Sequence, residues 1–267
     1  MHIVVCVKQV PDPDAAFSML KVDEQAKKVI PAPGLPLVMS TFDEQALEAA
    51  LRVRESLGEA KITAVGVGPQ SARSMLKHAL AMGADEALLI DDPLLQDAAS
   101  EATALALVAV IRHLGPFDLV LTGRQAADGD AGIVGCGVGE LLRIPVVTFA
   151  RKVEVSGGVA RVERMLADGF ETLEAALPAL VTVSNELGAA RKPNLRETMR
   201  AARKPLAVKS AAEIGLAASD VERVSRLRVR ERLFVPIKSG QCEIISGPDE
   251  IQQAVRLAEC LREARLI

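Results

Sequence analysis

Short apolar runs alternate with amphipathic stretches along most of the chain. Several of these runs are apolar at both odd and even positions, which is typical of strands covered on two faces. The stretches between the runs have helical spacing, so the pattern predicts a doubly wound, mostly parallel α/β sheet with helices on both faces. The apolar runs are residues 3–7, 61–67, 87–90, 118–122, 146–149 and 180–183.

Three of the expected helices carry start or stop signals. Residues 42–57 place apolar side chains along one side, and Thr41 with Glu44 forms a capping-box pattern at the start. Residues 69–82 begin at a proline and stop at a glycine, as helices often do. Residues 96–114 predict a third helix, which ends before Gly115.

Two parts of the chain depart from this alternation. Residues 153–155 and 159–165 flank Ser156-Gly157-Gly158, which predicts a β-hairpin insertion. The chain is basic and irregular from about residue 184 to residue 209, and residues 221–235 fit a helix or a strand.

The last part of the chain predicts a helix over residues 249–261 with one apolar stripe. We predict an α/β domain over residues 1–230 and a C-terminal arm over residues 231–267. The alternative is that the last helix packs on its own domain, which is the commoner fate of such a stripe. The stripe consists of Ile251, Ala254, Val255, Ala258 and Leu261.

The glycine-rich segment 123–139 is the strongest candidate for a ligand site. It follows the apolar run 118–122 and leads into a helix that we expect around residues 138–142. Its glycines would let the backbone approach a ligand, and free amides at the helix start would suit a phosphate. Asp128 and Asp130 better suit a ribose hydroxyl, a helix cap or loop amides. A flexible glycine turn with capping aspartates is an equally good interpretation.

Composition excludes several classes of protein. Nucleic-acid binders usually carry a basic excess, whereas this chain has a net charge of −3 over 267 residues. No apolar run has the length of a membrane span. The N-terminus reads as a strand and not as a signal peptide. The four cysteines and three histidines form no metal-ligand pairs, so we predict a cytoplasmic protein with reduced thiols and no metal. No nucleophile, base and orienting group stand out, so we expect no catalytic residues.

Residues 191–209 carry seven basic side chains against one acid, Glu197. This segment is either a solvated face or a docking surface for an acidic partner, in which Leu195 or Met199 would be the apolar anchor. The chain has no Trp and no Tyr, and six Phe. If a flavin is involved, a partner would therefore hold its ring.

Several segments together resemble the beta subunit of electron-transferring flavoproteins over most of the chain. The resemblance implies an electron carrier, not an enzyme with its own substrate. It implies a heterodimer with an FAD-bearing alpha subunit, on which the C-terminal arm would dock, and an acyl-CoA dehydrogenase-type electron donor. The matching segments are residues 7–12, 42–52, 68–69, 79–85, 193–201 and the loop Gly-Arg-Gln-Ala-Ala-Asp-Gly-Asp at 123–130.

The resemblance also implies site residues. Leu195 matches an apolar anchor for partner dehydrogenases, within a recognition loop over residues 184–205. The implied nucleotide contacts are Cys6, Ser40, Thr41, Phe42, Asp43, Val67, Gly123, Arg124, Gln125, Ala126, Ala127, Asp128, Gly129, Asp130, Ala131, Gly132, Ile133 and Val134.

The nucleotide itself stays open at this point. The common type of the family binds AMP as a structural nucleotide, whereas bifurcating relatives hold a second FAD that takes hydride from NADH. Gly132, Ile133 and Val134 stand where the AMP type has Asn-Gln-Thr, while Asp128-Gly129-Asp130 resembles the bifurcating type. A stand-alone nucleotide-binding domain without a partner is a third alternative.

Overall fold

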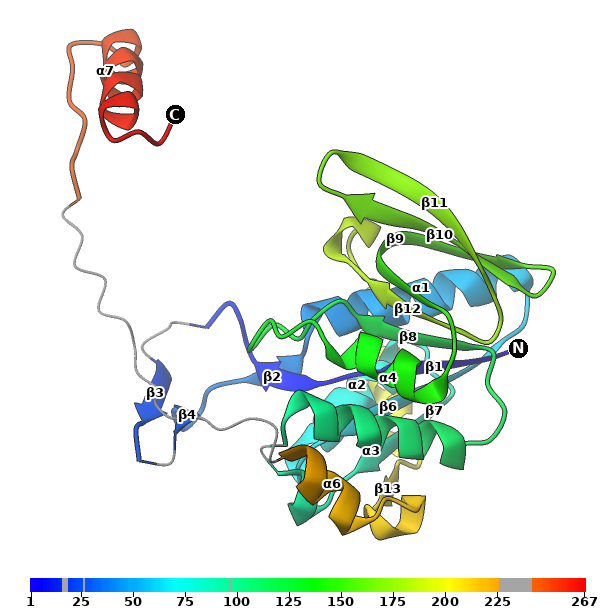
Figure 1. The fold of residues 1–267 in the computed structure, drawn as a ribbon. Helices are drawn as coiled ribbons and strands as arrows, with labels where there is room; N and C mark the ends of the chain where they lie inside the picture. Colours follow the sequence, from blue (N-terminus) through cyan, green and yellow to red (C-terminus); the bar gives the residue numbers. More distant parts are fainter. Residues whose placement is uncertain (16–18, 26, 97, 226–241) are drawn as a thin grey trace.

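A nine-stranded sheet forms the centre of the molecule (Figure 1). The computed structural model describes residues 1–15, 19–25, 27–96, 98–225 and 242–267. The strand order is β11-β10-β9-β12-β8-β1-β6-β7-β13, in which the seven strands from β9 to β13 run parallel and β10 and β11 extend the sheet in antiparallel fashion. The predicted doubly wound, mostly parallel sheet is confirmed.

The strands predicted from the sequence are present, and others join them. The predicted hairpin joins β9 and β10 through Gly157 and Gly158, whose φ angles of 57° and 79° belong to the left-handed region. The sheet strands are β1 His2–Cys6, β6 Lys61–Val67, β7 Glu86–Ile90, β8 Leu119–Gly123, β9 Val146–Ser156, β10 Val159–Leu166, β11 Gly169–Ala176, β12 Ala179–Val183 and β13 Ala207–Lys209. Two short antiparallel pairs precede the first helix: β2 Gln9–Pro11 with β5 Leu37–Met39, and β3 Leu20–Asp23 with β4 Lys28–Pro31.

Helices cover both faces of the sheet, and single-turn 3₁₀ helices connect some of them. One face carries α1 Thr41–Leu57 and α2 Arg73–Met82, and α5 Leu195–Arg203 packs against α2. The other face carries α3 Ser100–His113, α4 Val134–Leu142 and α6 Ala218–Ser225. The 3₁₀ helices are η2 Gln70–Ala72, η3 Pro93–Leu95, η4 Asn185–Leu187 and η5 Ala212–Ile214, and α7 Glu250–Glu263 is the last helix in the described residues.

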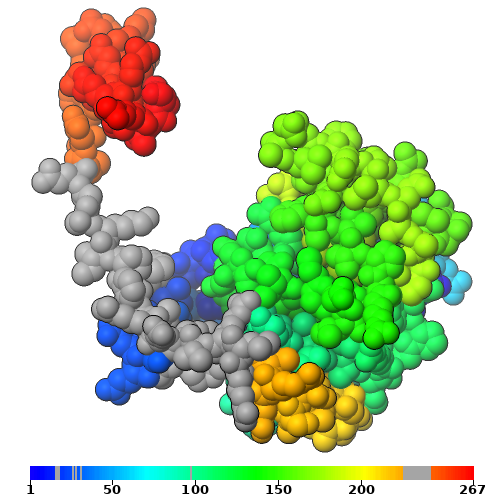
Figure 2. Space-filling view, viewed as in Figure 1, coloured from blue at the N-terminus to red at the C-terminus, as the bar shows by residue number. Residues whose placement is uncertain are grey.

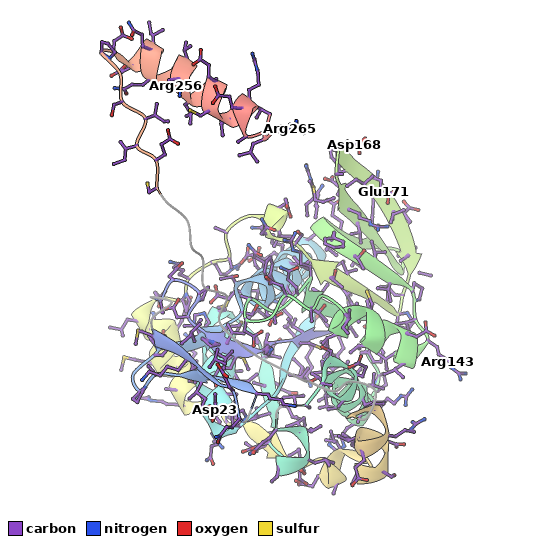
Figure 3. All side chains as sticks on the ribbon, turned by 60° about the vertical axis from the view of Figure 1, so that its left-hand side comes forward. Asp23, Arg143, Asp168, Glu171, Arg256 and Arg265 are labelled. Atoms are coloured by element: carbon purple, nitrogen blue, oxygen red, sulfur yellow. The ribbon has the colours of Figure 1, made fainter. Side chains whose placement is uncertain are left out.

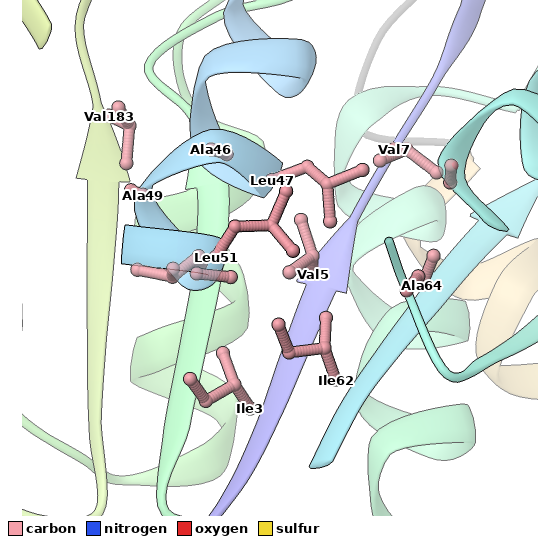
Figure 4. Close-up of a cluster of buried hydrophobic side chains, with 14 of the residues drawn as sticks. Ile3, Val5, Val7, Ala46, Leu47, Ala49, Leu51, Ile62, Ala64 and Val183 are labelled. Atoms are coloured by element: carbon pink, nitrogen blue, oxygen red, sulfur yellow. The ribbon is translucent and has the colours of Figure 1, made fainter. Parts of the chain in front are cut away.

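The core shows why the apolar runs have no alternation. Successive side chains of a strand point to opposite faces, so a strand between two helical layers needs apolar residues at both parities. Ile3 and Val5 of β1 belong to the apolar cluster beneath α1 (Figure 4). Val4 and Cys6 of the same strand belong to the cluster beneath α3. Each fully buried large side chain of this kind contributes about 1.5–3 kcal/mol.

The start of α1 differs from the prediction. The N-cap is Ser40, without a side-chain cap, so the capping box expected from Thr41 and Glu44 is wrong. The Ser40 hydroxyl instead accepts a bond from the Ala127 amide, 3.3 Å away, and Glu44 lies 3.1 Å from the His78 ring nitrogen. These partners are distant in sequence, so local spacing could not reveal them.

Other helix boundaries also shift. The predicted helices at residues 69–82 and 96–114 begin later, at Arg73 and Ser100, each behind a 3₁₀ turn. Helix α4 begins four residues before the predicted 138. The irregular segment after residue 183 contains η4, α5 and the edge strand β13.

Helix α7 lies apart from the α/β body in Figures 1 and 2, and Figure 3 labels Arg256 on this helix and Arg265 just after its end. Its N-cap Asp249 accepts a bond from the Gln252 amide, and none of its residues is buried. The apolar stripe is therefore not covered by the chain's own domain. The predicted boundary at residue 230, and residues 226–235 of the ambiguous segment, lie outside the described residues, whereas residues 221–225 are helical. In the part of the chain that the structure describes, no helix is long and apolar enough to cross a membrane.

Three glycines of α4 serve close packing and not ligand approach. A Cβ atom added at Gly135 would lie 2.7 Å from the Thr122 hydroxyl, and one at Gly139 would lie 2.1 Å from a methyl group of Val146. A Cβ at Gly137 would lie 3.3 Å from Ala104 of α3. The expectation that these glycines admit a ligand is thus corrected: they bring α4 against the sheet and α3.

The substitution Gly139→Ala is expected to lower the free energy of unfolding by about 1–3 kcal/mol, because the new methyl group overlaps Val146. Denaturant unfolding measures the loss, and the double variant with Val146→Ala should recover part of it. Gly129→Ala is the matched control, since a Cβ there has no atom within 4 Å. Equal losses in Gly139→Ala and Gly129→Ala would contradict this packing role.

Candidate functional site

The candidate site lies where the direction of the sheet reverses. From β1 the chain passes through α1 to β6 on one side, and later through α3 to β8 on the other side of β1. Open α/β sheets bind ligands in the crevice at such a switch point, outside the carboxyl ends of the strands. In this sheet the position of such a crevice is behind the ends of β1 and β8.

Asp43 of α1 bridges this switch point. One carboxylate oxygen accepts a bond from the Lys8 amide behind β1, at 2.8 Å, and the other accepts one from the Gly123 amide at the end of β8, at 3.0 Å. The Asp43 side chain is buried. Burial raises the pKa of the Asp43 carboxyl to about 7, although the two amide bonds lower it. We call these three residues the Asp43 clasp, which ties the ends of both strands to the start of α1.

Gly123 makes the clasp sterically possible. An added Cβ would lie 2.6 Å from a carboxylate oxygen of Asp43 and 2.7 Å from the Cβ of Phe42. Any side chain would therefore push α1 away from the end of β8. Only glycine permits this approach.

Side chains of the protein fix the loop that follows Gly123. The Ala127 amide donates to the Ser40 hydroxyl, and Lys8 forms an ion pair with Asp128 at 2.7 Å. The Gln125 amide group donates to Asp130 at 2.8 Å. The ion pair offsets the charge of Asp128, so the loop repels a phosphate less than its two aspartates suggest.

Arg124, the residue that follows β8, lies close to two aromatic rings. Its guanidinium carbon is 4.9 Å from the ring centre of Phe42 and 5.8 Å from that of Phe149, within cation–π range. One guanidinium nitrogen donates to the Ser184 hydroxyl at 3.1 Å. Ser184 also bonds Glu186, and this bond holds the pKa of the Glu186 carboxyl below its usual value. The Nε atom of Arg124 is buried and finds no hydrogen-bond partner among the described residues.

The Cys6 thiol supplies no reactive group at this site. It is buried among the apolar residues beneath α3, and burial raises its pKa well above the usual range. A thiol that stays protonated is a poor nucleophile and metal ligand. Within the described ranges, no group of three His, Cys, Asp or Glu side chains is arranged to hold a metal ion.

These features fit a nucleotide. The N-cap of α4 is Ile133, whose side chain cannot cap the first helical amides. Those amides and the spare Arg124 nitrogen suit phosphate oxygens, because a helix N-terminus and a cation both attract an anion. Gly129 borders open space, and the rim of the loop from Asp128 to Ile133 is exposed. The exposed carboxylate of Asp130 suits a hydroxyl donor.

The structure brings most of the predicted nucleotide-site residues together. Ser40, Phe42 and Asp43 contact the loop at residues 123–128 through the bonds described above. Thr41 is exposed at the start of α1, and Val67 is half-buried at the end of β6. Ala131, Gly132 and Ile133 lie on the exposed rim, and Val134 is the first residue of α4.

Sequence reasoning missed three residues of the site, namely Lys8, Phe149 and Ser184. Lys8 and Ser184 follow closely behind the buried parallel strands β1 and β12. Polar residues at that position are a usable signal, because the carboxyl ends of parallel strands meet at one edge of the sheet. Phe149 gave no such signal, because it lies within a strand and not behind one. It has a left-handed φ of 58° where the pairing of β9 with β12 is irregular, and the sequence does not reveal this conformation.

Leu195 lies outside the crevice, at the start of α5. It is 77% exposed, and Met199, one turn further on, is 54% exposed. A capping box begins this helix: Asn194 accepts from the Glu197 amide at 3.0 Å, and Glu197 accepts from the Asn194 amide at 2.7 Å. Two large apolar side chains are thus displayed on a short helix with a defined start.

Arg191 fixes the chain just before α5. It donates to Glu48 at 2.7 Å and to Glu55 at 2.6 Å, both on α1. Burial alone would raise the pKa of Glu48, but hydrogen bonds from Arg191 and Arg52 hold it below its usual value. Glu48 therefore stays ionised at neutral pH and keeps this anchor closed.

Comparison with known proteins places these features in one family. The family model "Electron transfer flavoprotein domain" matches residues 29–214. "Electron transfer flavoprotein subunit beta" of Megasphaera elsdenii is 36% identical over 96% of this chain and 95% of its own length. The "Caffeyl-CoA reductase-Etf complex subunit CarD" of Acetobacterium woodii is 34% identical over the whole of both chains. "Electron transfer flavoprotein subunit beta" of Thermoanaerobacterium thermosaccharolyticum is 42% identical over 73% of each.

Proposed function

The chain belongs to the electron transfer flavoprotein beta-subunit family, and we propose that it pairs with an FAD-bearing alpha subunit to carry electrons between dehydrogenases and later acceptors. In this proposal the redox FAD binds mainly to the alpha subunit. The chain adds a nucleotide site and a docking helix. The donor is a dehydrogenase of the acyl-CoA type, which the likeness to a subunit of a caffeyl-CoA reductase complex supports.

The Asp43 clasp is the observation that carries the nucleotide part of the proposal. It places the loop after β8 and the uncapped start of α4 at the switch point of the sheet. The nucleotide that we assign to this crevice is AMP, which has no redox chemistry and stabilises the fold. The FAD shared with the alpha subunit supplies the electron-carrying chemistry of the complex.

Nucleotide content tests this assignment. We expect the purified complex of both subunits to release about one FAD and one AMP per heterodimer on denaturation. Chromatography against standards measures both. Two FAD and no AMP would overturn the AMP assignment, and absence of both nucleotides would overturn the proposed site itself.

A bifurcating complex with a second FAD in this crevice is the second candidate. It is favoured by the end of the loop and the first residue of α4, where Gly132, Ile133 and Val134 replace the side chains expected of the AMP type. In that case the complex would oxidise NADH. Reduction of the bound flavin by NADH in a stopped-flow spectrometer separates the two candidates, because the AMP form has no hydride acceptor in this subunit.

The apolar stripe of α7 supports a partner and argues against a stand-alone domain. Ile251 is 77% exposed and Val255 is 55% exposed, although they share one side of the helix. Exposed apolar stripes of this kind usually mark an interface. We propose that the predicted C-terminal arm packs on the alpha subunit through the apolar stripe of α7.

A further inference from the structure

Helix α5 displays the docking residues but has almost no apolar anchor of its own. Of its nine residues, all of which the structure describes, Ala201 alone is buried. Isolated helices of this length are marginal in water, so interactions at the ends must hold this one. The capping box at Asn194 and the Arg191 anchor secure its beginning. The C-terminal end of α5 must be held by other contacts.

Lys77 of α2 meets the end of α5. Its ammonium group donates to the carbonyl oxygens of Ala201 at 3.2 Å and Ala202 at 3.0 Å, and to that of Lys204. The last carbonyls of a helix lack partners within the helix and carry partial negative charge. An ammonium group has three donors, so one half-buried side chain can bind all three carbonyls, of which that of Ala201 also accepts the Lys204 amide.

Lys204 makes the reciprocal contact. It is the C-cap residue of α5, and its side chain donates to the carbonyl of Ala84, just behind α2, at 2.9 Å. Two lysines thus cross between α2 and α5, each bound to backbone carbonyls of the other segment. Backbone acceptors cannot change rotamer as side chains can. The contact therefore fixes where α5 lies relative to α2, in addition to stabilising the helix.

We propose that Lys77 is a positioning residue for partner docking: it holds α5 in the orientation in which Leu195 and Met199 enter the partner. This inference rests on the proposed docking role of Leu195. A helix that is fixed beforehand loses less conformational freedom on binding, and this lowers the cost of association. Lys77 itself does not touch the partner.

The test uses the purified complex of both subunits, with butyryl-CoA and a butyryl-CoA dehydrogenase as the electron source. Lys77→Met keeps the aliphatic stem but removes the donors. We expect the KM for the dehydrogenase to rise about tenfold, the scale of one lost charge-assisted interaction, with kcat unchanged. Hydrogen exchange of the α5 amides should accelerate at least about tenfold, while that of α1 and α3 stays the same. Lys77→Arg should restore both, because a guanidinium can also donate to several carbonyls.

Lys152→Met is the matched control. It removes one positive charge from the β9–β11 extension, where Lys152 pairs with Glu154, and it should change neither readout. An effect of charge on steering would fade at high salt, whereas the effect of a loosened helix persists. Unchanged α5 exchange, an unchanged KM or equal acceleration in every helix would each overturn the positioning role. If Leu195→Ala also left the KM unchanged, the docking proposal would fail as well; if only Leu195→Ala raised it, the positioning role of Lys77 alone would fail.

Discussion

Leu195→Ala is expected to raise the KM for the partner dehydrogenase about 10- to 100-fold while bound nucleotides stay in place. An exposed leucine gains nothing from its own fold, so its large apolar surface is free to enter a pocket of the partner. Central apolar anchors of this kind typically cost about 2 kcal/mol or more when truncated. Steady-state electron transfer from the dehydrogenase to the complex, as a function of dehydrogenase concentration, measures the change.

The control for this variant is Leu166→Ala. Leu166 is also exposed, at 42%, but it ends β10 at the turn into β11. Figure 3 labels Asp168 in this turn and Glu171 on β11. The same truncation there should leave the KM within about twofold, since scattered surface leucines contribute little. A similar increase in both variants would mean that general surface hydrophobicity, and not an anchor at α5, governs the encounter.

The parallel core was predictable because a strand buried on both faces is apolar at both odd and even positions. In β1, Ile3 and Val5 pack beneath α1 and Val4 packs beneath α3, so neither face has room for a polar residue. The segments that the prediction missed have no such apolar run. Strand β11 is largely exposed, and α5 buries Ala201 alone while its large apolar side chains Leu195 and Met199 face outward. Their structure depends on pairing with β10 and on polar contacts such as that of Lys77.

The candidate site divides in the same way. The sequence singled out Gly123, Asp128 and the loop between them because glycine and aspartate behind an apolar strand are a local signal. Lys8 and Ser184 belong to the same crevice, but contacts across 60 to 120 residues assemble it. The glycines of α4 misled the prediction, because a glycine run with low helix propensity looks like loop. Contacts with Thr122 and Val146 require those glycines in a helix.

Asp43→Asn is expected to weaken nucleotide binding about 10- to 100-fold. Both carboxylate oxygens accept amide N–H groups, and an Asn side chain has only one acceptor. Its NH₂ group would face either the Lys8 or the Gly123 amide, and a buried donor without an acceptor costs about 1–3 kcal/mol. The end of β1 or of β8 would then move, together with the loop that forms the site. Nucleotide content of the purified complex and calorimetric titration with AMP measure the loss.

Asp118→Asn is the control, because Asp118 accepts the His2 amide at 2.7 Å and so links the same two strands at their opposite, amino-terminal ends. It should lower stability without loosening the nucleotide.

The pH dependence supplies a second check. Burial raises the pKa of Asp43 from 3.8 to about 7, so the folded state holds this proton more tightly than the unfolded chain. The stabilisation from this group is therefore fully present below about pH 4 and is lost as the pH rises through about 7. Hence the free energy of unfolding of the wild type should fall more than that of Asp43→Asn between about pH 5 and about pH 8, because Asn does not titrate. Wild-type nucleotide affinity should rise over the same range, because the ionised carboxylate accepts both amides. A pH-independent difference would show that Asp43 does not titrate in this range.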